Sequence, residues 1–161
     1  MSQISRNGWA AYALAAAIVA ADQASKYWLL EILGLPERAP LHLFGPLQFT
    51  RIWNRGFSFG LLQAPNELVR WGMVLFSFAV AVLLTLWARR SGRLMTAAGL
   101  GCVIGGAVGN AIDRARFGAV VDFIDVQQLG FFPWIFNVAD VAINVGVALL
   151  LLDSLRRERP A

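Results

Sequence analysis

The sequence predicts a mainly α-helical membrane protein, in which four transmembrane helices carry a small antiparallel β-sheet outside the membrane. Of its 161 residues, 58% are hydrophobic and 15% are charged, whereas soluble domains average about 45–50% apolar and about 25% charged residues. A chain of this length has no core large enough to hide that excess, so lipid must cover it. The apolar residues also form long runs with arginines at their ends, as membrane proteins do. We therefore expect one integral membrane domain over residues 1–161.

Four segments are long and apolar enough to cross a membrane, which takes about 20 residues of helix. They are residues 9–30, 71–88, 94–112 and 134–152. Helices are expected because backbone groups in lipid must satisfy their own hydrogen bonds. The first segment could instead be a signal peptide cleaved after Ala21. Apolar residues resume at Tyr27-Trp28-Leu29-Leu30, which favours a full span.

The distribution of arginine predicts the orientation. Residues 1–8, 89–93 and 153–161 together hold seven arginines in 22 positions, while residues 31–70 and 113–133 hold six in 61 positions. Basic residues favour the cytoplasmic side. Both termini and the 89–93 turn are therefore expected in the cytoplasm, with the two longer segments outside.

The outer segments contain two candidate strands. Residues 47–53 are rich in aromatic and β-branched residues and follow a Gly45-Pro46 turn signal, and residues 119–124 follow Gly118. Such patterns are typical of strands. We expect a small sheet at the outer membrane surface and a short amphipathic helix over residues 61–69.

Ionisable residues within the spans are candidates for function, because they are costly in lipid. Asp22 and Lys26 lie four residues apart on one helix face and can pair. A structural brace for the outer half of the first span is one interpretation, and a direct role in catalysis is the other.

The third span carries a row of small residues and then a polar group. Glycines at 101, 105 and 109 favour close helix packing. Asn110, Asp113 and Arg114 follow on one face if the helix continues. Asp113 could pair with an arginine, or the arginine could hold a carbonyl group.

Two further aspartates stand in apolar surroundings. Asp140 lies between Asn137 and Asn144 in a helical stripe that should not face lipid, although a buried structural aspartate remains possible. Asp122 interrupts a candidate apolar strand, and such local conflicts tend to mark function. Asp125 should point to the other face of that strand and be solvated.

If Asp122 and Asp140 meet, they can carry acid–base chemistry without help. Two close carboxylates share one proton, which provides an acid and a base near neutral pH. One cysteine, Cys102, and one histidine, His42, exclude an internal disulfide and argue against metal or Ser–His chemistry. There is no HExxH motif. We expect no metal, no cofactor and, despite a net charge of +4, no nucleic-acid partner.

Five blocks, spread through nearly the whole chain, resemble those of lipoprotein signal peptidases, also called signal peptidase II. They are DQASK at 22–26, NRGFSFG at 54–60, GGAVGNAIDR at 105–114, VVDF at 120–123 and FNVAD at 136–140. Each block alone is a weak signal. Five in this order, in a chain of this size and topology, are specific.

The resemblance implies a bacterial inner-membrane aspartyl endopeptidase that removes signal peptides from diacylglyceryl-modified prolipoproteins, just before the lipidated cysteine. It implies that Asp122 and Asp140 are catalytic. It assigns a substrate-facing pocket to Asn54, Gly56, Asn110, Arg114 and Asn137, and structural support to Asp22, Lys26 and Asp113. It also implies an outer sheet that cradles the substrate. The expected partners are prolipoproteins and membrane lipid, and we expect a monomer.

Three positions depart from the family pattern and two other functions stay open. Arg55 stands where the family commonly has a small polar residue, and Phe57 and Ser58 stand where it often has alanine. A small transporter would place its site near the membrane midplane, unlike the carboxylates here. A non-catalytic assembly factor would need Asp122 and Asp140 for folding only.

Overall fold

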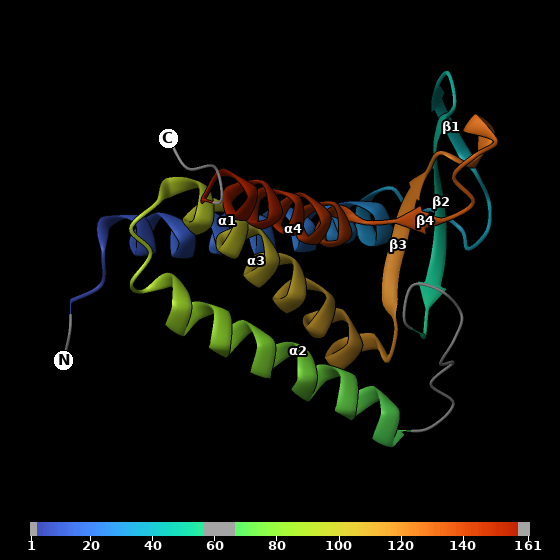
Figure 1. Ribbon diagram of the computed structural model, residues 1–161. Coiled ribbons are helices and arrows are strands. Elements are labelled where there is room, and N and C mark those ends of the chain that lie inside the picture. The colour runs from blue at the N-terminus through green and yellow to red at the C-terminus, as the bar shows by residue number, and fades with distance from the viewer. Residues whose placement is uncertain (1–2, 57–66, 158–161) are drawn as a thin grey trace.

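The computed structural model describes residues 3–56 and 67–157, which form a helical bundle with a sheet across one end (Figure 1). The long helices are α1 (Arg6–Tyr27), α2 (Glu67–Ala88), α3 (Leu94–Phe117) and α4 (Val138–Arg157), and a π-helical turn, Trp28–Ile32, continues α1. The strands are β1 (Leu41–Phe44), β2 (Leu47–Asn54), β3 (Val120–Asp125) and β4 (Ile135–Phe136), and a 3-10 turn, Gln127–Leu129, follows β3. The predicted fold class is confirmed.

Among the described residues, three helices are long and apolar enough to cross a membrane: residues 67–88, 94–117 and 138–156. Helix α1 is as long as α2, at 22 residues, but it is rich in alanine and its last turns are polar. It runs parallel to α3, with Ala11 against Gly101 and Asp22 against Gly109. That α1 also spans the membrane stays a prediction, and this alignment with α3 favours it.

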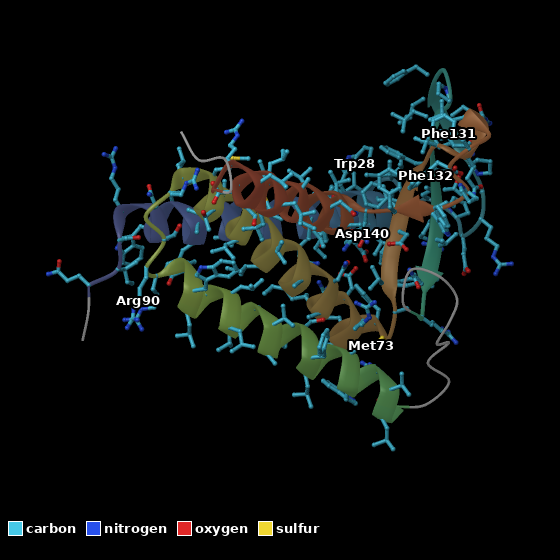
Figure 2. All side chains as sticks on the ribbon, viewed as in Figure 1. Trp28, Met73, Arg90, Phe131, Phe132 and Asp140 are labelled. Atoms are coloured by element: carbon cyan, nitrogen blue, oxygen red, sulfur yellow. The ribbon has the colours of Figure 1, made fainter. Side chains whose placement is uncertain are left out.

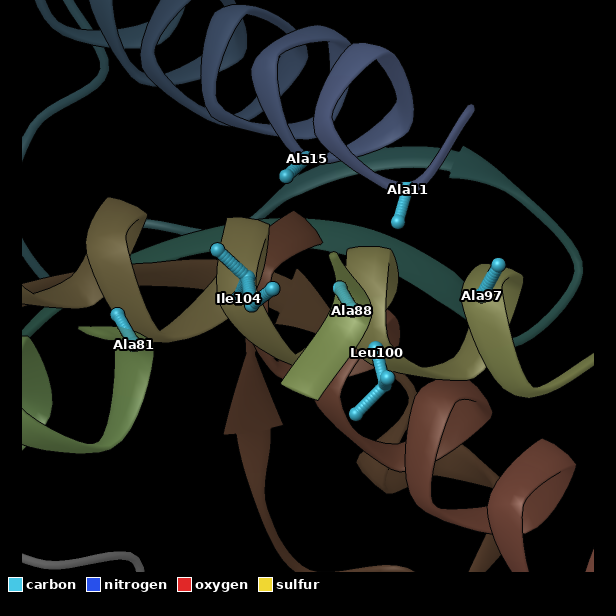
Figure 3. Close-up of a cluster of buried hydrophobic side chains, with 7 residues drawn as sticks. All are labelled: Ala11, Ala15, Ala81, Ala88, Ala97, Leu100 and Ile104. Carbon is cyan, nitrogen blue, oxygen red and sulfur yellow. The ribbon is translucent and has the colours of Figure 1, made fainter. Parts of the chain in front are cut away.

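Small residues bring the helices close together, as the glycine row predicts. A Cβ atom added at Gly101 would lie 2.7 Å from the Ala11 carbonyl oxygen, and one at Gly105 would lie 2.8 Å from the Ala15 oxygen. Such distances leave room for hydrogen only. Beside this contact lies a core of small and medium apolar side chains (Figure 3): Ala11, Ala15, Ala81, Ala88, Ala97, Leu100 and Ile104. Helix α3 is thereby held in the middle of the bundle.

The sheet has the antiparallel order β1-β2-β3-β4. The two predicted strands are confirmed as β2 and β3, and they pair from Gln48 opposite Asp125 to Asn54 opposite Val120. The short strands β1 and β4 were not predicted. Strand β1 has four residues and is exposed along its whole length, and β4 has two residues only.

The helix ends differ from the predicted spans at the sheet. Helix α3 continues to Phe117, five residues past the predicted end, and stops at Gly118, whose φ of 74° is left-handed. Helix α4 begins at Val138 and not at Trp134, because Ile135 and Phe136 pair with β3. Of the short helix expected over 61–69, residues 61–66 lie outside the described part of the chain, and 67–69 belong to α2.

Candidate active site

The two candidate catalytic carboxylates lie where the helical bundle meets the sheet. Asp122 is in the middle of β3 and is 1% exposed. Asp140 is in the first turn of α4, and Figure 2 shows it at this junction. Val121 and Phe123 pack into an apolar cluster, so the alternation of the strand turns Asp122 to the opposite face. The fold thus brings a strand residue and a helix residue to one place.

A chain of hydrogen bonds through two asparagines joins the carboxylates. Asn137 Nδ2 donates to Asp122 Oδ1 at 2.6 Å and to Asn110 Oδ1 at 3.3 Å, and Asn110 Nδ2 donates to Asp140 Oδ1 at 2.8 Å. Asn137 is fully buried and Asn110 is 8% exposed. Both amides are therefore committed to orienting the two carboxylates.

Asn137 also caps helix α4. Its Oδ1 accepts from the Asp140 backbone N–H at 3.0 Å, and Asp140 Oδ2 accepts from the Asn137 N–H at 3.3 Å. This reciprocal pattern is a capping box, with aspartate in place of the usual glutamate. Asn144 is exposed and donates to the Asp140 backbone oxygen, so of the two asparagines in the predicted stripe only Asn137 contacts the carboxylate.

The end of β2 closes the other side of the site. Asn54 Nδ2 donates to Asp122 Oδ2 at 2.9 Å, and Asn54 Oδ1 accepts from the Gly56 N–H at 3.0 Å. The Gly56 oxygen accepts from Arg114 at 3.3 Å. The guanidinium of Arg114 also interacts electrostatically with Asp122 and Asp140. All five predicted pocket residues thus surround the two carboxylates, and Phe57 and Ser58 lie outside the described residues.

The support residues form one buried ionic cluster. Lys26 Nζ lies 2.7 Å from Asp22 Oδ2 and 2.8 Å from Asp113 Oδ2. The predicted Asp22–Lys26 pair is confirmed. The predicted pairing of Asp113 with an arginine is wrong, because Lys26 of α1 pairs with this carboxylate instead. Arg114 instead holds a carbonyl group, the other alternative. Gln23, which sequence reasoning missed inside the DQASK block, donates to Asp113 Oδ1 at 2.9 Å and to Asp22 Oδ2 at 3.1 Å.

Burial, and after it the negative charge of Asp140, raise the pKa of Asp122 to about 7. Hydrogen bonds from Asn54 and Asn137 and the charge of Lys26 act in the opposite direction. A carboxyl with this pKa holds its proton over much of the range in which an ordinary aspartate is ionised. The pair can therefore carry one proton between two carboxylates near neutral pH.

Asp125 was expected to be solvated, and this is wrong. It is 1% exposed, and its carboxylate accepts from Gln48 at 2.7 Å, from Thr50 at 2.7 Å and from the Gln127 N–H at 2.9 Å. The chain covers it with the 3-10 turn, which the strand pattern gave no means to foresee. Across residues 3–56 and 67–157, no group of three or more His, Cys, Asp or Glu side chains is placed to hold a metal ion.

A membrane helix bundle that holds two coupled aspartates at one end defines an integral membrane enzyme. The chain belongs to the signal peptidase II family, whose model, described as Signal peptidase (SPase) II, matches residues 14–156. It is 51% identical to the lipoprotein signal peptidase of Caulobacter vibrioides, covering 96% of this chain and 92% of that protein. It is 46% identical to the lipoprotein signal peptidase of Methylorubrum extorquens, covering 87% and 82%.

Two solved structures have the same fold. A bacterial membrane enzyme structure determined by the in meso method at 2.3 Å resolution matches with a TM-score of 0.83 and 24% identity, over 100% of this chain and 99% of that one. A second, at 1.9 Å, matches with a TM-score of 0.79 and 25% identity, over 96% and 97%. Family and fold make this chain a protease of the signal peptidase II type in the bacterial inner membrane.

Proposed function

We propose that this protein removes the signal peptide from diacylglyceryl-modified prolipoproteins, cutting the peptide bond just before the lipidated cysteine. The observation that carries this proposal is the hydrogen-bonded chain from Asp122 through Asn137 and Asn110 to Asp140. It gives one site an acid and a base at the end of a membrane bundle. The relatives named as lipoprotein signal peptidases support the substrate class.

Asp122 and Asp140 are proposed to act together on a water molecule. One carboxylate accepts a proton as the water oxygen attacks the scissile carbonyl carbon, while the protonated carboxyl donates to the carbonyl oxygen. A proton then passes to the leaving nitrogen and the C–N bond breaks. The two groups titrate as a pair, so the base and the acid are roles of the pair and not of either residue alone.

Arg114 and the nearby amides are proposed to hold the substrate and the charge that forms on it. Arg114 NH2 lies 3.3 Å from the Gly56 oxygen at the end of β2. An extended peptide laid beside the end of β2 could be held by backbone hydrogen bonds. A guanidinium fixed beside the reacting carbonyl would stabilise the developing oxyanion. Asn54, Gly56, Asn110 and Asn137 complete this pocket, and Arg55, which is exposed beside it, could bear on substrate preference.

The membrane arrangement is part of the same proposal. Helices α1 to α4 provide the spans of a single domain, and the segments that join α1 to α2 and α3 to α4 lie outside with the active site. The arginines at the sheet-free end of the bundle support a cytoplasmic location for both termini. Exposed apolar side chains on the helices, such as Leu75, Leu83 and Leu151, face lipid. We expect a monomer, because one chain supplies both carboxylates and the described groups that contact them.

The catalytic assignment is tested by measuring how fast the purified protein in detergent cleaves a diacylglyceryl-modified prolipoprotein. Wild type should cut before the lipidated cysteine, whereas Asp122→Asn and Asp140→Asn should stay folded and lose at least about a hundredfold in rate. Asp125→Asn is the matched control, since it changes a buried aspartate of the same strand outside the site. It should keep cutting.

Other outcomes distinguish the alternatives. If both variants retain the wild-type rate, another group performs the chemistry. If wild type does not cut and both variants unfold, the carboxylates are structural and the assembly-factor hypothesis is favoured. For orientation, single cysteines placed in the 89–93 turn and in β1 of a Cys102→Ala chain can be labelled in intact spheroplasts with an impermeant maleimide. Only the β1 position should react, and the reverse pattern would overturn the proposed topology.

A further inference from the structure

Four structural elements converge on the buried ionic cluster of Asp22, Lys26 and Asp113. Asp22 and Lys26 come from α1, Asp113 comes from α3, and all three are 2% exposed or less. Lys26 bridges the two carboxylates at 2.7 and 2.8 Å. A brace between α1 and α3 alone would need only one such contact, and burying three charges is costly unless each remaining oxygen is also used.

The remaining contacts of this cluster reach the residue that precedes each candidate catalytic aspartate. Asp22 Oδ1 accepts from the backbone N–H of Ala139 at 3.0 Å, and Ala139 precedes Asp140. Asp113 Oδ2 accepts from the backbone N–H of Val121 at 3.1 Å, and Val121 precedes Asp122. Strand β3 and helix α4 therefore contact Lys26 indirectly, β3 through Asp113 and α4 through Asp22, next to the positions of Asp122 and Asp140.

We propose that the Asp22–Lys26–Asp113 cluster is a positioning group that sets the distance between Asp122 and Asp140, and so controls turnover more than substrate binding. This inference rests on the proposed function of the two aspartates. The cluster touches neither substrate nor reacting atoms. It acts through the backbone of Val121 and Ala139, and Gln23 joins its two carboxylates a second time. Displacement of a reacting group by about 1 Å can cost about a hundredfold in rate.

The glycine row offers a test that leaves every charge in place. A Cβ atom at Gly109 would lie 2.7 Å from Asp22 Oδ2, whereas at Gly101 it would lie 2.7 Å from the Ala11 backbone oxygen, two helical turns away. Gly109→Ala therefore crowds the Asp22 carboxylate and, at 3.4 Å, the Cβ atom of Ala139, whereas Gly101→Ala crowds the backbone of α1. Only the first displaces the positioning cluster. Gly109→Ala should lower kcat by about 10- to 100-fold with KM within about twofold, and Gly101→Ala should leave kcat nearly unchanged.

Charge variants provide a second readout, because the cluster acts on Asp122 through its field as well. Asp140 from α4, Lys26 from α1 and Arg114 from α3 interact electrostatically with Asp122. Lys26 and Asp22 from α1 and Arg114 also interact with Asp140. Removing the positive charge in Lys26→Met should make the pair keep its shared proton to higher pH. Removing a negative charge in Asp22→Asn should make it lose that proton at lower pH. The alkaline limb of the kcat–pH profile should therefore move in opposite directions, while Lys26→Arg should move it least.

These measurements use the same purified protein and prolipoprotein, with melting temperature read beside activity. The inference is overturned if Gly109→Ala and Gly101→Ala lose kcat equally. It is also overturned if the alkaline limb of the kcat–pH profile moves in neither charge variant. In both cases the cluster is a structural brace only. If Lys26→Met does not fold, Asp22→Asn and the glycine pair still decide. The proposed function is tested separately: it fails if wild type does not cut or Asp122→Asn remains active, whatever the positioning variants do.

Discussion

Asp122 and Asp125 lie three residues apart on β3 and are each 1% exposed, yet the pKa values of their carboxyl groups are shifted in opposite directions. Burial and the charge of Asp140 raise the pKa of Asp122 to about 7. Burial also acts to raise the pKa of Asp125, but the Gln127 backbone N–H, Thr50 and Gln48 outweigh it, and the net pKa is lowered. One aspartate is surrounded to hold a proton and the other to hold a charge. The strand thus carries a reactive carboxyl and a structural one.

The raised pKa of Asp122 predicts that this residue costs stability as pH rises. In the unfolded chain the carboxyl ionises near pH 3.9, whereas in the folded protein it keeps its proton to about pH 7. Its contribution to the free energy of unfolding is therefore full below about pH 4 and is lost as pH rises to about 7. The amide in Asp122→Asn cannot ionise, so the melting temperature of this variant relative to wild type should rise between pH 4 and 8. Parallel curves for the two proteins would contradict the shifted pKa.

Asp125 should behave in the opposite way. Its lowered pKa means that its contribution is present above the unfolded pKa of about 3.9 and is lost as pH falls through the folded pKa. Asp125→Asn should lower the free energy of unfolding by about 1–3 kcal/mol near pH 7, because its new amide faces donors and not acceptors. The difference in unfolding free energy between Asp125→Asn and wild type should become smaller as the pH falls below 4. Thermal melts from pH 3 to 7 measure this difference. If it does not change with pH, the charge of Asp125 does not contribute to stability.

Asn137→Ala should damage stability and activity by different amounts. The substitution removes the cap of α4, which costs about 1 kcal/mol, and also both amide contacts that orient Asp122 and join Asn110. We expect a modest loss of melting temperature and a loss of cleavage rate of about a hundredfold or more. Asn144→Ala is the control on the same helix, since Asn144 is exposed and contacts only a backbone oxygen. Equal rates for the two variants would remove Asn137 from the site.

Arg70 should be needed for stability at the outer end of α3. Its Nε donates to the Arg114 oxygen and its NH2 to the Ala115 oxygen, each at 2.8 Å, and its NH1 pairs with Glu67 at 3.0 Å. A cation at a helix C-terminus and hydrogen bonds to its last carbonyl groups favour the fold. Arg70→Ala should cost about 1–2 kcal/mol in unfolding free energy.

Arg116→Ala is the matched comparison for Arg70→Ala, because Arg116 is an exposed arginine in the last turn of α3, next to the carbonyl groups that Arg70 binds, and contacts the ring of Phe117. It should change the melting temperature little. Arg70→Lys should not restore stability, since a single ammonium cannot reproduce a planar fork on two carbonyl groups. Full rescue by lysine would mean that charge alone matters there.

Much of this protein could be predicted from residue patterns that act locally. Apolar runs predicted the helices of the bundle, the arginines at their ends predicted an orientation, and two β-branched runs predicted β2 and β3. The Asp22–Lys26 spacing predicted an ion pair that a single helix can form by itself. The fold class, these elements and the two aspartates in apolar surroundings were therefore accessible, because each signal depends on neighbours a few residues away.

Tertiary packing decided the partners and the ends of the elements. Lys26 also binds Asp113, 87 positions later, only because glycines let α1 and α3 approach. Helix α4 starts late because β3 pairs with Ile135 and Phe136, and Asp125 is buried because a turn folds over it. The sequence by itself determined which groups would be costly to place in lipid. Only the three-dimensional fold determined how each is compensated, because a buried charge takes its partners from whichever elements pack beside it.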